Sequence, residues 1–141
     1  MRIHLVLALS VLASGLAGAV PLWNEPAVVK AVGKKVISKE KEKDGDCMVS
    51  RYFFRKSPDV ALEFRCNRVN IAWDQFKEKE FEQKNKEAVA LATRAAAALS
   101  KDSGKEVSEA AAGNVIRKRP LSSGLTVGGS CSLPSCLLTY R

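Results

Sequence analysis

The sequence predicts a small α+β domain: a small antiparallel sheet of the meander or hairpin type, one long α-helix packed on it, and two disulfides. Residues 47–66 contain two runs rich in β-branched and aromatic residues on either side of the turn-forming pair Ser57-Pro58. Residues 74–100 are strong helix formers without Gly or Pro. The chain has 4 cysteines, and an even number favours paired bridges. They are Cys47, Cys66, Cys131 and Cys136.

The two outer cysteines of residues 47–66 suggest a register for this hairpin. Placing Cys47 opposite Cys66 brings their Cβ atoms within reach of a disulfide, which leaves Cys131 to pair with Cys136. The same register gathers apolar side chains on one face, the predicted core: Val49, Phe53, Val60, Leu62 and Phe64. The other face then carries Met48, Ser50, Tyr52 and Phe54 on the first strand, and Ala61, Glu63 and Arg65 on the second.

The first 19 residues have the parts of a secretory signal peptide. Arg2 supplies the positive start, residues 5–12 form an apolar run, and Ala17-Gly18-Ala19 is a small-residue cleavage site. We expect cleavage after Ala19 and a secreted or periplasmic protein, in a compartment where disulfides form. The alternative is an uncleaved anchor, because residues 3–20 are just long enough to span a membrane. Removing 19 of 141 residues leaves 122, enough for an arm at 20–33 and one domain at 34–141.

Two features are expected before the hairpin. In the arm, Asn24 and Pro26 favour the cap and first turn of a short helix, although an irregular arm with a β-strand also suits these residues, and Trp23 is expected to tether the arm to the core. Asp44-Gly45 predicts a two-residue turn that pairs Ile37 near Tyr52 and completes a three-stranded meander. The alternating Lys-Glu run at 39–43 indicates a solvated ribbon, with lysines that protect a sheet edge.

After Cys66 the apolar residues change from even to odd positions, so we expect a bulge or bend at 66–68. Asp74 is the predicted N-cap of a helix that continues to Ser100. At about 1.5 Å per residue this helix is longer than the domain is wide, so either its charged first half projects into solvent or it kinks near Asn85. A stripe in the second half marks the side expected to face the sheet: Ala88, Leu91, Ala92, Ala95 and Leu99.

The last third of the chain alternates turn residues with short apolar runs. Ser103 and Glu106 match a capping box in front of a short helix at 107–112 that ends at Gly113. A strand at 115–117 is expected to stop by Pro120. Residues 125–127 and 137–140 are predicted to be late strands that join the sheet.

Most catalytic and metal chemistry is excluded by composition. The only histidine, His4, lies in the predicted signal peptide, which removes histidine triads and histidine acid–base schemes from the mature chain. The cysteine spacings match neither a zinc site nor a redox-active Cys-x-x-Cys pair. We therefore expect no catalytic residue, metal or cofactor. A histidine-free hydrolase would need carboxylates, and those nearest the predicted sheet are Asp59, Glu63 and Asp74.

The formal net charge of +8 fits an acidic protein partner, anionic lipid or a cell-wall polymer, whereas export argues against nucleic acid. We predict an exported, non-enzymatic binding protein, such as an inhibitor, an immunity-type factor or an effector, that acts through protein contact. The alternative is a basic module that binds the cell envelope or a cell-wall polymer. The predicted contact residues lie on the outer hairpin face and its loop, where aromatic and charged groups mix: Tyr52, Phe54, Arg55, Lys56 and Arg65. The alternative is that other strands or the N-terminal arm bury Tyr52 and Phe54.

Overall fold

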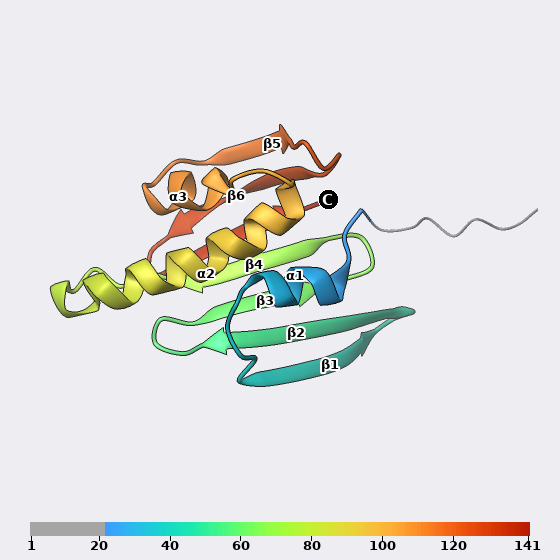
Figure 1. The fold of residues 1–141 in the computed structure, drawn as a ribbon, viewed down its shortest axis with the longest axis horizontal. Coiled ribbons are helices and arrows are strands. Elements are labelled where there is room, and N and C mark those ends of the chain that lie inside the picture. Colours follow the sequence, from blue (N-terminus) through green and yellow to red (C-terminus); the bar gives the residue numbers. More distant parts are fainter. Residues whose placement is uncertain (1–21) are drawn as a thin grey trace, which may run out of the picture.

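The computed structural model describes residues 22–141, which form a seven-stranded antiparallel sheet with helices on one face (Figure 1). The predicted fold class, an α+β domain with one long helix packed on an antiparallel sheet, is confirmed. The predicted signal peptide and its cleavage site lie outside the described residues. Within residues 22–141, none of the helices has both the length and the apolar character needed to span a membrane.

The strands follow the order β1-β2-β3-β4-β7-β6-β5 across the sheet. The first four form a meander, and β7 then pairs with β4, so the C-terminal strands extend the meander from that side. The predicted late strands are thereby confirmed, and β1 and β5 form the two edges. The bounds are β1 Ser38–Asp44, β2 Cys47–Arg55, β3 Val60–Phe64, β4 Val69–Asp74, β5 Ile116–Pro120, β6 Thr126–Ser132 and β7 Ser135–Tyr140.

The helices are α1 Glu25–Ala31, the 3₁₀ turn η1 Lys79–Phe81, α2 Glu82–Ser100 and α3 Lys105–Ala111. The Asn24 side chain caps α1 by accepting a hydrogen bond from the amide of Ala27 over 3.0 Å, so the helical alternative for the arm is confirmed. The long helix α2 lies over β4 and runs roughly along the strands (Figure 1), and it buries the predicted stripe together with Ala96. Small alanine side chains let α2 approach the strands closely.

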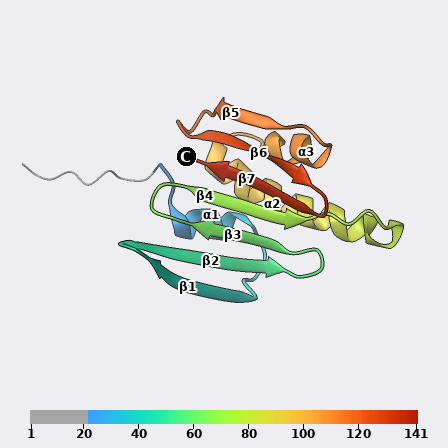
Figure 2. The same cartoon turned by 180° about the vertical axis from the view of Figure 1, so that it is seen from behind.

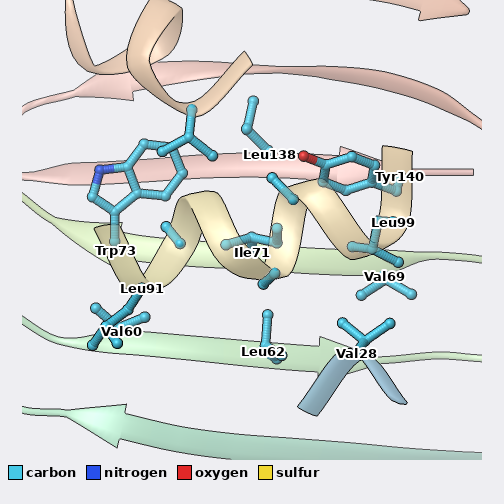
Figure 3. Packing of buried hydrophobic residues seen from close by; sticks show 14 of the residues in the cluster. Val28, Val60, Leu62, Val69, Ile71, Trp73, Leu91, Leu99, Leu138 and Tyr140 are labelled. Carbon is cyan, nitrogen blue, oxygen red and sulfur yellow. The ribbon is translucent and has the colours of Figure 1, made fainter. Parts of the chain in front are cut away.

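The core lies between the sheet and the helices (Figure 3). Ile71 and Trp73 on β4 and Leu138 on β7 are each at most 1% exposed and face Leu91 and Leu99 of α2. Val28 of α1 and Val32, the residue that follows this helix, belong to the same cluster, so the arm packs on the domain. Burial of this apolar surface is the dominant favourable contribution to folding.

Both disulfides form as predicted, Cys47–Cys66 with Cα atoms 5.8 Å apart and Cys131–Cys136 with Cα atoms 4.0 Å apart. The predicted register of the β2–β3 hairpin is nevertheless wrong by one residue, because Tyr52 lies opposite Leu62 and Arg51 opposite Glu63. Such a slip reverses the face of every side chain on one strand. Residues Ser50, Tyr52 and Phe54 therefore face the helices, whereas Val49, Arg51 and Phe53 face the other way.

The turns on either side of this hairpin also differ in detail. The β1–β2 turn consists of Gly45 and Asp46, so Lys39 lies opposite Tyr52 in place of Ile37. Gly45 has a φ of +61°, which suits a turn that requires glycine at its first central position. The bend expected at 66–68 is confirmed as the reverse turn between β3 and β4, in which the amide of Arg65 donates to the carbonyl of Arg68 over 2.9 Å.

Two predicted helix caps are wrong. Asp74 ends β4, where it pairs with Ser135 of β7, and α2 begins only after η1. The segment between them is held by Asn85, whose side-chain amide donates to the carbonyl of Phe76 over 2.7 Å and accepts from the amide of Phe76 over 3.1 Å. Glu106 does not close a capping box, because its carboxylate is buried and accepts a hydrogen bond from Tyr140.

Candidate interaction surface

The sheet has one covered and one uncovered face. Helices α1, α2 and α3 all lie on the same side (Figure 1), and Figure 2 shows the strands from the other side, in front of the helices. We call this second side the open face. Because side chains alternate along a strand, its residues follow directly from the observed pairing.

The aromatic members of the predicted contact set do not lie on the open face. Phe54 is 0% exposed and belongs to the core, so of the two alternatives for this side of the hairpin, exposure or burial by other strands or the N-terminal arm, the structure shows burial. Tyr52 is half-buried beside α1, and its hydroxyl donates to the Glu25 carboxylate over 2.7 Å. Burial, together with the hydrogen bond to Glu25, raises the pKa of Tyr52 above its usual value. Both rings serve packing in this structure.

The charged members of the predicted set are dispersed. Arg55 forms an ion pair with Glu87 of α2 and thereby joins the hairpin to that helix. Lys56 is exposed in the β2–β3 loop. Arg65, just after β3, makes ion pairs with Glu63 and Asp44 on the open face. Of the predicted contact residues, Arg65 is thus the one that joins the uncovered side of the sheet.

A row of apolar side chains crosses the centre of the open face. The observed register places Phe53 opposite Ala61, Ala61 opposite Ala72, and Ala72 opposite Leu137. Leu137 is 46% exposed. The two alanines are short and lie between larger side chains, so a hollow of about 210 Å³ forms over them. We call Phe53, Ala61, Ala72 and Leu137 the apolar row.

A chain of ion pairs runs along one side of the apolar row. Glu63 accepts hydrogen bonds from Arg51 over 2.6 Å, from Arg65 over 2.7 Å and from Asn70 over 2.9 Å. Each arginine also pairs with a carboxylate near the β1 edge, Arg51 with Glu42 over 3.0 Å and Arg65 with Asp44 over 2.9 Å. We call this set the charged network; its members are Glu42, Asp44, Arg51, Glu63, Arg65 and Asn70.

The charged network fixes both the charge and the position of its central carboxylate. Partial burial acts to raise the pKa of Glu63, but the hydrogen bonds from Arg65, Arg51 and Asn70 outweigh it and lower the pKa below its usual value. Glu63 is therefore held in the ionised form, with its hydrogen-bonding capacity largely used. The network presents an ordered and nearly neutral surface beside the apolar row.

The opposite side of the apolar row carries two carboxylates. The amide of Asp59 donates to the Asp74 carboxylate over 3.3 Å, and both residues border a hollow of about 230 Å³ that also touches Phe53 and Ser135. No salt bridge to either one occurs within the described part of the chain. The structure thus brings together two of the carboxylates considered for hydrolysis, whereas Glu63 belongs to the charged network.

Phe53 and Leu137 were not predictable as surface residues because each is adjacent to another large apolar residue. Phe53 is followed by Phe54, and Leu137 by Leu138, so alternation does not show which member of each pair is buried. Only the register of the whole sheet distinguishes them, and it buries Phe54 and Leu138 at 0% exposure.

No group of three or more His, Cys, Asp or Glu side chains in residues 22–141 could hold a metal ion. The arrangement offers surface chemistry of the kind used in recognition: an apolar centre, fixed charges on one side and free carboxylates on the other. Comparison of the chain with protein-family models, curated proteins and solved structures gave no match.

Proposed function

We propose that this chain is an exported, non-enzymatic binding protein and that the open face is its contact surface for another protein. The observation that carries the proposal is the apolar row, which lies at the centre of the sheet face that the helices leave uncovered. Protein interfaces typically combine a central group of apolar and aromatic side chains with a polar rim. The charged network and the Asp59/Asp74 pair supply such a rim on the two sides of the row.

The side chains of the open face suit particular side chains on a partner protein. The hollow over Ala61 and Ala72 suits an apolar side chain seated between Phe53 and Leu137. Beside it, Asp59 and Asp74 suit a lysine or arginine of the partner, because these carboxylates have no cation of their own in the described residues. The arginines on the other side are already paired and would contribute order more than net charge.

Site-specific cross-linking identifies the partner and tests the face together. A photo-reactive amino acid is placed at Leu137 on the open face or at Ala90, an exposed position on α2. Both are exposed, so random collisions label them similarly. We expect one discrete adduct from position 137 under native conditions and none from position 90. Equal labelling at the two positions would show that the open face has no selective partner.

A matched pair of substitutions then measures the contribution of the hollow. Ala72→Arg fills it with a long charged side chain, whereas Ala90→Arg makes the same change on α2. We expect Ala72→Arg to weaken binding of the cross-linked partner at least about 10-fold, or roughly 1.4 kcal/mol, and Ala90→Arg to leave it unchanged. Full affinity in a folded Ala72→Arg protein would remove the apolar row from the interface.

A further inference from the structure

The edge strand β1 separates its charges by face. All seven of its residues are exposed, and its sequence alternates lysine with acidic residues. Lys39, Lys41 and Lys43 lie opposite Tyr52, Ser50 and Met48 of β2, on the helix side of the sheet. Glu40 and Glu42 lie opposite Arg51 and Val49, on the open face. The alternating run therefore produces one basic and one acidic side instead of a mixed surface.

The two sides differ in how their charges are compensated. On the open face, Glu42 and Asp44 are paired with Arg51 and Arg65. On the helix side, the β1 lysines form no salt bridge with any residue of the described chain, and the Lys39 ammonium lies 4.8 Å from the centre of the Tyr52 ring. The β1 lysines thus have no ion pair among the described residues, and the nearby Glu25 carboxylate, which accepts a hydrogen bond from Tyr52, offsets only part of the charge of Lys39.

More lysines extend this basic edge. Lys30 is in the last turn of α1, and Lys34 and Lys35 are in the segment that links α1 to β1 along the helix side (Figure 1). All are exposed. We call the whole set the lysine edge; its members are Lys30, Lys34, Lys35, Lys39, Lys41 and Lys43.

Two exposed apolar side chains flank the β1 lysines. Ile37, 51% exposed, comes directly before β1, and Met48, 55% exposed, lies opposite Lys43 at the other end of the strand. Isolated exposed apolar residues are common, but these two lie at the two ends of the row of lysines, and the pairing of Met48 with Lys43 places Met48 on the helix side with them. Lysines flanked by exposed apolar side chains form the combination by which proteins bind the surface of an anionic bilayer.

We propose that the lysine edge binds an anionic lipid surface. It contains lysine and no arginine, whereas Arg51, Arg55, Arg65 and Arg119 are all fixed in ion pairs. A compact charge on a flexible stem suits mobile headgroups, while arginine suits fixed bidentate partners. Ile37 and Met48 enter the headgroup region when the lysines make contact. Because the lysine edge and the open face are separate surfaces, this proposal and the protein-binding proposal can fail independently.

Co-sedimentation with vesicles tests the proposal. Vesicles of phosphatidylcholine with phosphatidylglycerol are compared with pure phosphatidylcholine vesicles, using the wild type and the variant Lys39→Gln/Lys41→Gln/Lys43→Gln. Since each lysine near an anionic surface contributes about fivefold to binding, the variant should bind about 100-fold more weakly. The control is Lys77→Gln/Lys79→Gln/Lys84→Gln, which changes three exposed lysines at the η1 end of the molecule and removes the same net charge.

We expect the four proteins to differ in their binding to the two kinds of vesicle. Wild type and control bind the anionic vesicles, added salt weakens this binding steeply, and neither binds pure phosphatidylcholine. Ile37→Ser/Met48→Ser should weaken binding while leaving the salt dependence unchanged. Equal losses in the two lysine variants would show that net charge alone acts and would overturn the proposal. So would binding of the wild type to a soluble acidic polymer or acidic protein without binding to the anionic vesicles.

Discussion

Removal of one hydroxyl from the core by Tyr140→Phe tests the role of the buried pair Tyr140 and Glu106. The Tyr140 hydroxyl donates to the Glu106 carboxylate over 2.8 Å, and the two residues are 0% and 2% exposed. Phenylalanine has the same ring, so the change opens almost no cavity. It deprives a buried carboxylate of a donor that water cannot replace.

The size of the effect follows from this burial. A hydrogen bond to a charged group contributes roughly 1.5–3 kcal/mol, and a buried group left without its partner loses it in full. We expect Tyr140→Phe to lower the free energy of unfolding by about 2 kcal/mol. At the usual unfolding entropy per residue, this corresponds to a decrease in Tm of about 8 °C for a domain of this length.

Thermal and urea unfolding monitored by circular dichroism measure the change, with Tyr52→Phe as the matched control. The Tyr52 hydroxyl also donates to a glutamate, Glu25, over 2.7 Å, but both side chains retain access to water. Water can replace the lost donor there, so Tyr52→Phe should lower stability by less than about 1 kcal/mol. The difference between the two variants isolates the contribution of burial.

A second substitution provides the decisive comparison. Glu106→Met in the Tyr140→Phe background removes the unpartnered carboxylate and preserves its approximate volume, so part of the lost stability should return. A change in the free energy of unfolding of less than about 0.5 kcal/mol in Tyr140→Phe would contradict a stabilising role of the Tyr140–Glu106 hydrogen bond. A lower stability of Tyr140→Phe/Glu106→Met than of Tyr140→Phe alone would contradict this role as well.

Three further predictions concern stability. Replacing Cys47 and Cys66 with alanine should lower the free energy of unfolding by about 3 kcal/mol, and replacing Cys131 and Cys136 with alanine should lower it by about 2 kcal/mol. The first effect is larger because the Cys47–Cys66 bridge closes a longer loop in the unfolded chain. Urea unfolding of each double variant measures the two effects, and a larger effect from the short loop would contradict this entropic explanation. Burial, with a contribution from Glu106, raises the pKa of Tyr140 in the folded state far above 10, so stability should fall as pH rises above about 10, where the unfolded chain ionises. This loss should be clearly smaller in Tyr140→Phe, in which only the weaker effect of groups such as Tyr52 remains, and an unchanged loss would contradict the prediction. Folding lowers the pKa of Glu63, so this carboxylate stabilises the protein at pH values above its usual pKa, and the stabilisation is lost as the pH falls through the pKa of the folded state. Glu63→Gln should therefore lose less stability in acid than the wild type. Identical dependence of stability on acid pH in the two proteins would contradict this role.

Features that depend on neighbouring residues were predictable from the sequence. The Asn24 cap, the apolar stripe of α2 and the reverse turn after β3 each depend on side chains within a few positions of one another. The Cys47–Cys66 pair was predicted from the hairpin, and Cys131–Cys136 followed as the remaining pair; both pairs are correct although the register used for the hairpin is wrong by one residue. In these segments local chemistry and tertiary structure agree.

The register of the hairpin was not predictable in the same way. Cys66 lies beyond Phe64, the last residue of β3 in the ladder, so the Cys47–Cys66 bridge can form without its cysteines being ladder partners. Aromatic residues on both faces of β2 left the alternation ambiguous, and a shift of one residue exchanged the two faces of β2, while Val60, Leu62 and Phe64 of β3 stayed in the core. The candidate contact residues moved with it, from Tyr52 and Phe54 to Phe53 and Leu137.

Residue pattern and short-range chemistry are sufficient to specify the class of this protein's fold, its two disulfides and the sheet-facing side of its long helix. The end of β4 depends on long-range pairing, since Asp74 pairs with Ser135 far along the chain instead of capping a helix. The same holds for the partner of Glu106 and for the face of each β2 side chain. These outcomes depend on long-range pairing, in which the summed burial across the sheet outweighs local preference.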